Sequence, residues 1–190
     1  MPKVNNHHFY SSAIKKYGTT PKGVNWISAK TQKLRFKAIA KFLPKDLDSF
    51  SVVDAGCGFG DFYTFLKTKP KNYIGLDIHE DMCAIASNQT GEVVLQKDIC
   101  KDLLPMGDFY ICSGAMNVLT SFETHLFIQN CFKSSKIAFI FNILYGSKES
   151  QTYNYMSKDE VLSIAKELKV RDVGFNEGYL EDDITVVFYK

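Results

Sequence analysis

The sequence predicts a three-layer α/β/α fold built on one doubly wound, mostly parallel sheet of about seven strands. Short β-like runs alternate along the chain with amphipathic helical stretches, and the middle runs are too apolar to be exposed on one side. Two further β-like runs close the chain without a helix between them, which predicts an antiparallel last strand. Because 190 residues, 45% of them hydrophobic, suffice for one core, we predict a single domain over residues 1–190.

The individual elements follow from local periodicity and from turn and capping signals. Five strands are predicted first, at residues 50–55, 73–78, 93–96, 109–113 and 136–144. Four helices are predicted at 61–67, 80–87, 120–132 and 157–168, the last two opening with capping boxes, Thr120-x-x-Glu123 and Ser157-x-x-Glu160. The closing strands are predicted at 170–175 and 184–189.

The N-terminal segment is predicted to be helical and is strongly basic. Residues 28–43 have a helical apolar period that ends before Pro44, residues 9–17 predict a shorter helix, and residues 18–23 predict a loop. Residues 1–45 hold ten of the 23 Lys and Arg and no Asp or Glu, so this segment carries +10 and the rest carries −8. Two interpretations stay open, a solvated helical face and a surface for an anionic partner such as RNA. Since Arg35 and Arg171 are the only arginines, a dedicated nucleic-acid reader is disfavoured.

Several classes of protein are disfavoured by what the sequence lacks. No apolar stretch approaches the roughly 20 residues of a membrane-spanning helix, and the start does not resemble a secretory signal, so we expect a cytoplasmic protein without a membrane partner. The five cysteines include no CxxC pair, and no histidine has metal-ligand spacing with Cys, Asp or Glu. We therefore expect reduced thiols and no metal.

A glycine-rich turn follows the first buried strand and is the strongest local signal of a ligand site. Gly56, Gly58 and Gly60 have GxGxG spacing, which differs from the GxGxxG of dinucleotide-binding folds, and Asp54 stands two residues before the first glycine. A pyrophosphate favours helix N-terminal amides and no adjacent negative charge. A carboxylate at this position instead suits a ligand that carries an ammonium or sulfonium group.

Two more acidic residues follow the next two strands. Asp77 lies about 20 residues after the glycine turn, the offset at which an acid accepts the ribose hydroxyls of an adenosine. Asp98 comes just after the third strand and is a candidate acceptor for an adenine amino group. Because the carboxyl ends of parallel strands meet at one edge, these groups are expected to share one site. Each acid also has an alternative, purely local role. Asp54 could cap the following turn, Asp77 could cap the following helix, and Asp98 could be an ordinary loop acid.

With these motifs in order, residues 28–190 resemble the class I S-adenosylmethionine-dependent methyltransferases of small single-domain bacterial type, with their Rossmann-like fold. The resemblance implies S-adenosylmethionine as cofactor and residues 46–190 as the cofactor-binding core, with residues 1–45 as a basic helical arm or lid. It assigns the methionine part to the glycine turn, ribose to Asp77, adenine to the next loop, and the methyl end to 108–117. The implied cofactor-binding residues are Asp54, Gly56, Cys57, Gly58, Asp77, Ile78, Asp98, Ile99 and Ser113, with Asn117 on the substrate side.

Other residues have a competing structural interpretation. Trp26 is either a cofactor contact or a core or lid anchor, and Arg35 either clamps the cofactor carboxylate or is a solvated arginine. We interpret Cys57 and Cys112 as small packing residues. His79 is interpreted as a surface residue and His125 as a packing residue.

The predicted function is transfer of a methyl group from S-adenosylmethionine to an unidentified acceptor, with a small molecule as first choice. No catalytic residue is assigned; His7, His8, Tyr10 and Tyr145 are unranked candidates for a base. The alternatives are an RNA methyltransferase that uses the basic arm, and a non-catalytic protein that binds S-adenosylmethionine or S-adenosylhomocysteine. A nicotinamide oxidoreductase is opposed by the GxGxG spacing and Asp54. Methylation of base or glutamine amines is disfavoured because no Asn/Asp-Pro-Pro-aromatic run follows the fourth strand.

Overall fold

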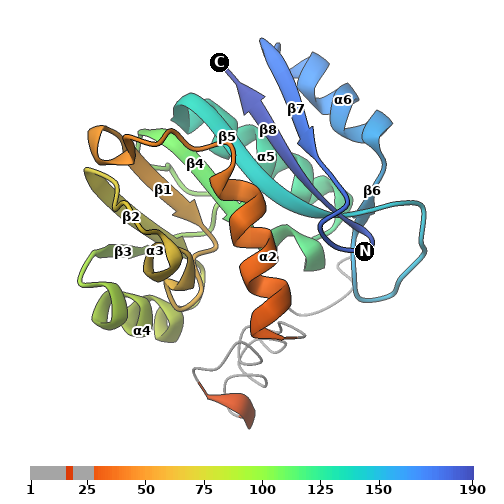
Figure 1. Ribbon diagram of the computed structural model, residues 1–190. Helices are drawn as coiled ribbons and strands as arrows, with labels where there is room; N and C mark the ends of the chain where they lie inside the picture. The colour runs from red at the N-terminus through yellow and green to blue at the C-terminus, as the bar shows by residue number, and fades with distance from the viewer. Residues whose placement is uncertain (1–15, 19–27) are drawn as a thin grey trace.

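A computed structural model describes residues 16–18 and 28–190, and its centre is one eight-stranded sheet (Figure 1). The strands are β1 (Ser51–Ala55), β2 (Asn72–Asp77), β3 (Val93–Gln96), β4 (Gly107–Ser113), β5 (Ser135–Tyr145), β6 (Tyr155–Met156), β7 (Asp172–Asn176) and β8 (Asp183–Tyr189). Their order across the sheet is β3-β2-β1-β4-β5-β8-β7, with β6 beside β5. The seven predicted strands all form within two residues of their expected ends, and only the two-residue β6 is additional.

Strand direction confirms the predicted fold class. Strands β1 to β6 pair with one another only in parallel within the described sheet, while β8 is antiparallel to both of its neighbours, β5 and β7. The sheet is therefore mostly parallel with an antiparallel last strand. In such a sheet the carboxyl ends of β1, β2 and β4 meet at one edge, where ligands bind in doubly wound folds.

The four helices predicted between residues 61 and 168 all form. The described helices are α2 (Ala29–Ala40), α3 (Asp61–Phe65), α4 (Glu80–Thr90), α5 (Ser121–Ser134) and α6 (Lys158–Glu167), with 3-10 turns η2 (Leu47–Ser49) and η3 (Ala115–Val118). Both predicted capping boxes form. The side chains of Thr120 and Ser157 each accept the backbone N–H of the glutamate three residues on, and that glutamate's carboxylate accepts the backbone N–H of the capping residue. The helix predicted at 28–43 forms as α2 and ends at Ala40, three residues before its predicted C-terminal end.

Helices pack on both faces of the sheet through apolar side chains, so the three predicted layers are present. On the face toward the viewer in Figure 1, Phe36 and Ile39 of α2 pack with Phe62 of α3 against β1, β4, β5 and β8. On the opposite face, Ile128 of α5 and Val161 of α6 pack against β4, β5 and β8. Helix α2 is thus part of the packed structure, and it brings its polar residues to the sheet edge.

Some predictions concern residues outside the described ranges. These are the helix at 9–17 except for its last two residues, the loop after Gly18, Trp26, and the base candidates His7, His8 and Tyr10. The division at residue 45 and the single-domain organisation stay predictions. Among the described residues, none of the helices combines the length and apolar character that crossing a bilayer requires.

Candidate functional site

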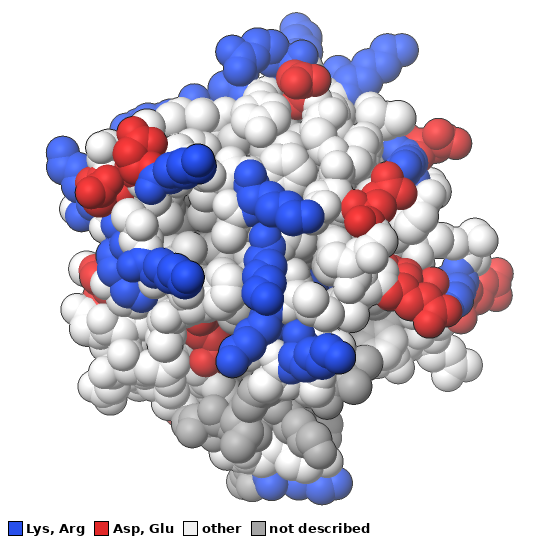
Figure 2. All heavy atoms as spheres, in the orientation of Figure 1, with Lys and Arg blue, Asp and Glu red and all other residues white. Residues whose placement is uncertain are grey.

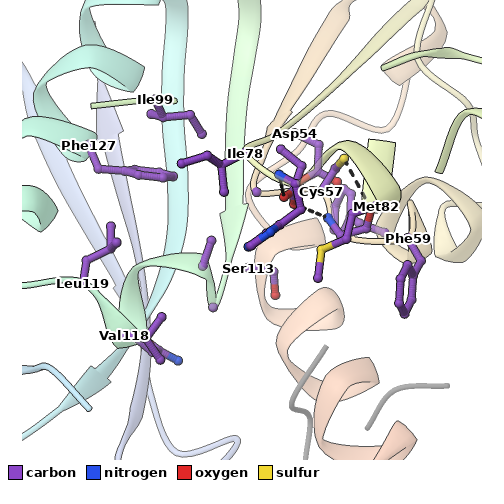
Figure 3. A pocket seen from close by; sticks show the side chains of 18 of the residues that line it. Asp54, Cys57, Phe59, Ile78, Met82, Ile99, Ser113, Val118, Leu119 and Phe127 are labelled. Atoms are coloured by element: carbon purple, nitrogen blue, oxygen red, sulfur yellow. Dashed lines mark hydrogen bonds between the residues drawn. The ribbon is translucent and has the colours of Figure 1, made fainter. Parts of the chain in front are cut away.

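A pocket opens at the carboxyl edge of the sheet, between α2, the glycine turn, the loop after β3 and η3 (Figure 3). It holds about 1140 Å³ of empty space, including the part open to solvent. Eleven predicted site residues line it: Arg35, Asp54, Gly56, Cys57, Gly58, Asp77, Ile78, Asp98, Ile99, Ser113 and Asn117. Trp26 lies outside the described residues. The fold thus brings together residues spread over 83 positions from Arg35 to Asn117, while their individual roles stay predictions.

The glycine turn has a backbone that only glycine adopts without strain. Gly56, Gly58 and Gly60 have φ of +77°, +56° and +80°. A Cβ on Gly56 would lie 2.3 Å from the Cβ of Ala115, so η3 packs directly on the turn. The backbone N–H groups of Gly56 and Cys57 both donate to the carbonyl of Leu76, at 2.8 and 2.9 Å. The turn is therefore fixed against the end of β2 and leaves the space above it open.

Asp54 is a buried carboxyl group at the end of β1. It is 2% exposed, and its Oδ2 accepts a hydrogen bond from the Tyr73 hydroxyl at 2.8 Å. Burial raises the pKa of Asp54 to about 7, against the opposing effect of the Tyr73 hydrogen bond. Among the described residues, no ion pair includes Asp54. A cationic ligand group beside Asp54 would favour its ionised form.

Asp77 ends β2 and ties the glycine turn to the next loop. Its Oδ2 accepts the backbone N–H of Gly58 at 3.0 Å, and its Oδ1 accepts that of His79 at 3.0 Å. Burial raises the pKa of Asp77 to about 6, while these backbone hydrogen bonds act in the opposite direction. His79 itself is buried, at 7% exposure, so our interpretation of it as a surface residue is wrong. The reason is that α4 begins directly after His79 and folds it against the end of β2.

An apolar slot forms the other side of the pocket. Ile78 is 43% exposed although apolar, and Figure 3 shows it pointing toward Phe127, with Ile99 beside them. Leu119 continues the same wall. Such a slot suits a flat, weakly polar ring. Phe127 and Leu119 were not predicted as site residues, because an apolar residue on a helix has the same sequence pattern whether it lines a pocket or the core.

Asp98 lines the pocket but is also engaged locally. Its carboxyl oxygens accept the backbone N–H of Cys100 at 3.0 Å and pair with the Lys101 ammonium at 2.8 Å. These contacts close the turn after β3. Both interpretations of Asp98, loop acid and ligand acceptor, therefore stay open.

The remaining predicted residues line the pocket and are hydrogen-bonded to distant parts of the fold. Ser113 donates its hydroxyl to Asn142 Oδ1 at 3.0 Å, and the Arg35 guanidinium pairs with Asp183. Asn117 is 9% exposed; its side-chain oxygen accepts the backbone N–H of Leu144 at 3.3 Å. The sequence did not predict these partners, because each lies at least 27 positions away along the chain.

Cys57, Cys112 and His125 have contacts and environments typical of structural residues. Cys57 and Cys112 are buried, and burial raises the pKa of both thiols, to about 12 for Cys112. His125 is partly exposed and lies 3.2 Å from Glu167, remote from the pocket lining. Within residues 16–18 and 28–190, no group of three His, Cys, Asp or Glu could hold a metal ion.

Residues 52–136, which include β2 to β4, all of β1 but its first residue, and the glycine turn, match a family model described as a methyltransferase domain. The chain has the class I methyltransferase fold. A magnesium protoporphyrin IX methyltransferase from Synechocystis PCC 6803, solved with bound S-adenosylhomocysteine, has a TM-score of 0.74 at 14% identity, over 97% of this chain and 95% of that chain. A methyltransferase from Thermotoga maritima has a TM-score of 0.71 at 17% identity, over 97% and 99%.

A third solved structure, an S-adenosylmethionine-dependent methyltransferase from Leishmania major, has a TM-score of 0.70 at 17% identity, over 100% of this chain and 86% of that chain. No curated protein sequence matches the chain significantly. The findings confirm the resemblance to class I S-adenosylmethionine-dependent methyltransferases and the predicted fold. The predicted cofactor is the one bound in a second Synechocystis structure.

Proposed function

We propose that the pocket binds S-adenosylmethionine and that the protein transfers its methyl group to a small-molecule acceptor. One observation carries the proposal. Two buried carboxyl groups, Asp54 and Asp77, flank a positive-φ glycine turn at the carboxyl edge of a parallel sheet, without a cationic partner among the described residues. Burial disfavours the ionised form of both groups, and a cationic ligand would restore it, so this arrangement is suited to a cationic nucleoside.

The residues present fit that cofactor group by group. Asp54 would face the ammonium and sulfonium end, and Asp77 the ribose hydroxyls, while the slot of Ile78, Ile99 and Phe127 would hold the adenine. When bound, S-adenosylmethionine supplies a methyl group on an electrophilic sulfonium. The chain's own contribution is to orient the two reactants and exclude water, which accounts for catalysis without an assigned base.

The proposed acceptor class rests on the shape of the pocket and on the structural neighbours. Residues of helix α2 and of η3 both line the pocket, so the site is concave. The Synechocystis neighbour is named for a small-molecule acceptor. Ser113 and Asn117 would lie at the methyl end and contact the acceptor.

Thermal unfolding with added ligands tests the proposal. At about 100 times its dissociation constant, a ligand adds roughly 2.7 kcal/mol, which raises the melting temperature by roughly 5 to 10 °C at this chain length. We expect this shift with S-adenosylmethionine and with S-adenosylhomocysteine but not with NAD. Asp77→Ala should abolish it, whereas Asp108→Asn, at the other edge of the sheet, should retain it.

Two outcomes would count against parts of this proposal. A shift with NAD alone would contradict the cofactor assignment. Binding of both adenosyl ligands without transfer of labelled methyl to any fraction of cell extract would favour the non-catalytic alternative.

A second candidate function, methylation of RNA, is favoured by the outer face of α2. Lys30, Lys33, Lys37 and Lys41 are exposed there at three- and four-residue spacing, and Figure 2 shows the band of lysines over this helix. The band is about 16 Å long at 1.5 Å per residue. Phe36 and Ile39 of α2 are buried in the core, and the exposed band consists of lysines, so a phosphate backbone fits the band better than the apolar interior of a membrane.

Anisotropy of a fluorescent single-stranded RNA separates this candidate from the first. If RNA is the partner, changing Lys30, Lys33 and Lys37 together to Gln should weaken binding about tenfold or more and reduce its salt dependence. A matched variant with Gln at Lys133, Lys166 and Lys169, which are exposed on α5, α6 and the turn after it, should bind like the wild type. Equal loss in both variants would indicate nonspecific attraction only.

A further inference from the structure

A buried tyrosine of β2 contacts Asp54 from outside the pocket. Tyr73 is 2% exposed and does not line the pocket. In the register of β1 and β2, Tyr73 pairs with Val52, and Asp54 lies two residues after Val52, on the same face of the sheet. The Tyr73 hydroxyl thereby reaches Asp54, to whose Oδ2 it donates a hydrogen bond at 2.8 Å.

Packing of the core accounts for the ring of Tyr73 but not for its hydroxyl. The ring lies in an apolar cluster with Val52 and Phe62. It also contacts the ring of Tyr63, with 4.8 Å between the two centroids. A hydroxyl buried in such surroundings is costly unless it has a hydrogen-bond partner. Among the described residues, Asp54 is the one hydrogen-bond partner of the Tyr73 hydroxyl, so the hydroxyl serves the Asp54 carboxyl group.

The hydrogen bond engages one oxygen of Asp54 and leaves the other for a ligand. Asp54 lines the pocket, and its Oδ1 accepts no hydrogen bond from residues 16–18 and 28–190. Burial raises the pKa of the Tyr73 hydroxyl well above its ordinary value, so Tyr73 stays a donor across the neutral pH range. Its hydrogen bond favours the ionised form of Asp54, in opposition to the effect of burial.

Other ionisable groups also lie near Asp54. They are Asp77 of β2, Asp61 of α3, Cys57 of the glycine turn and Cys112 of β4, while Arg35 lines the same pocket from α2. Asp77 and Asp61 raise the pKa of Asp54 by charge repulsion. Within the described part of the chain, Tyr73 is the only hydrogen-bond donor to the Asp54 carboxyl group. A change at Tyr73 therefore removes one defined contact of Asp54 and leaves these neighbours in place.

We propose that Tyr73 is a positioning residue that holds Asp54 by its Oδ2, so that Oδ1 is presented to the ammonium group of the adenosyl ligand. The proposal rests on the proposed function and adds a residue outside the pocket on which binding of the amino acid part of the ligand depends. The adenosine part would lie against Asp77 and the apolar slot, which Tyr73 does not contact through a hydrogen bond. Tyr73 should therefore act on one part of the ligand only.

The test compares the affinities of S-adenosylhomocysteine and 5′-methylthioadenosine, measured by calorimetry on the full chain between pH 6 and pH 9. 5′-Methylthioadenosine shares the adenosine and the thioether but lacks the amino acid. The ratio of the two affinities therefore reports the contacts of the amino acid part, since Asp77 and the apolar slot act on both ligands. For the wild type, this ratio should rise with pH and level off above the pKa of Asp54, which is about 7.

Tyr73→Phe removes the hydroxyl and keeps the ring. Because a hydrogen bond to the ionised form of Asp54 is lost, the midpoint of the rise should move up by about one pH unit. The ionised fraction at pH 7 then falls from about a half to about a tenth, so the ratio at this pH should fall roughly fivefold. The affinity for 5′-methylthioadenosine should stay within about twofold of the wild type.

Tyr63→Phe is the matched control. It removes a hydroxyl from the ring that packs on Tyr73, but this hydroxyl donates to Glu92 instead of Asp54. Its affinity ratio should follow that of the wild type at every pH. In an Asp54→Asn background, Tyr73→Phe should change the ratio by less than about twofold, since the group through which Tyr73 acts is gone.

Equal weakening of both ligands by Tyr73→Phe, with an unchanged midpoint, would show a merely structural role and overturn the proposal. If Tyr73→Phe does not fold, 3-fluorotyrosine in place of Tyr73 decides. Its hydroxyl is a stronger donor and should lower the midpoint, and an unchanged midpoint would again overturn the proposal. If the wild type binds both ligands at a ratio independent of pH, the adenosyl site stands but the roles of Asp54 and Tyr73 fail. If neither ligand binds the wild type, the proposed function itself fails.

Discussion

The two edges of the sheet use the same residue type in opposite ways. At the amino edge, Asp108 accepts the backbone N–H and the hydroxyl of Ser51, at 2.8 and 2.7 Å, and lies 3.7 Å from the Lys136 ammonium. These contacts lower its pKa. At the carboxyl edge, burial raises the pKa of Asp54 to about 7 and that of Asp77 to about 6. An aspartate with a complete set of partners stabilises the fold, whereas the buried aspartates that have no ion pair within residues 16–18 and 28–190 lie at the edge where we propose that a ligand binds.

The backbone conformation also differs between the two edges of the sheet. At the carboxyl edge, the chain leaves β1 through Gly56 and Gly58 at positive φ, and it leaves β4 through Gly114, also at positive φ. At the amino edge, Ser51 and Asp108 are joined by side-chain hydrogen bonds, and the register of β4 against β5 shifts between Gly107 and Phe109. The carboxyl edge thus depends on glycines at positive φ, whereas at the amino edge Gly107 is required by packing, since its Cβ would lie 2.6 Å from Val53 Cγ2.

The largest expected effect is that of Gly56→Ala. The new Cβ would lie 2.3 Å from that of Ala115 at a φ of +77°, so strain and overlap together should reduce the free energy of unfolding by about 3 kcal/mol or more. Urea unfolding measures this directly. Gly91→Ala is the control, because Gly91 has a φ of +72° and no atom within 4 Å of its Cβ position; it should lose only about 1 kcal/mol. Equal losses would show that η3 does not pack on the turn.

The next effect is the dependence of stability on pH. Because the folded-state pKa of Asp54 is raised from 3.8 to about 7, the folded chain keeps a proton that the unfolded chain releases. The contribution of Asp54 to stability is therefore complete below about pH 4, falls as the pH rises, and is fully lost above about pH 7. Asp54→Asn has no carboxyl group to ionise and so avoids this loss. The free energy of unfolding of the variant, relative to that of the wild type, should therefore increase by about 2 to 4 kcal/mol as the pH rises from 4 to 8. A constant difference would contradict the raised pKa.

Asp108 should show a smaller effect with the opposite sign. Its folded-state pKa is lowered, so its contribution is present above the unfolded value of 3.8 and is lost as the pH falls through the folded value. Asp108→Asn should therefore cost about 1 kcal/mol at pH 7 and less near pH 2. Chemical unfolding at both pH values checks this. A gain at pH 7 would show that the two edges do not differ as described.

The sequence predicted the parts of the molecule that depend on local pattern. The glycine turn, Asp54 and Asp77 were found because spacing within about 25 residues specifies a strand, a turn and the next strand end. The same locality accounts for the strands, which are correct within two residues. Asp98 stayed ambiguous in the sequence and stays so in the structure, since it both closes a turn and lines the pocket.

What the sequence could not predict depends on contacts between distant segments. Arg35 and Asp183 are 148 positions apart, and nothing in the pattern around either residue indicates the other. Tyr153 lines the pocket from the loop before β6, which is held to η3 by the backbone N–H of Asn154, a donor to the Asn117 carbonyl at 2.7 Å. His79 was misplaced for the same reason, since its burial is determined by how α4 packs on β2. Tertiary packing, rather than periodicity, decides all three.

The most direct test of the central claim is the affinity of the chain for S-adenosylhomocysteine at pH 6 and pH 8, measured by calorimetry. If the ammonium of the ligand pairs with ionised Asp54, whose pKa in the free protein is about 7, affinity should rise about tenfold over this interval, as the ionised fraction does. Asp54→Asn should bind more weakly and lose most of this rise. Absence of binding at both pH values, or affinity that falls as the pH rises, would contradict the account of this pocket as a site for a cationic adenosyl cofactor.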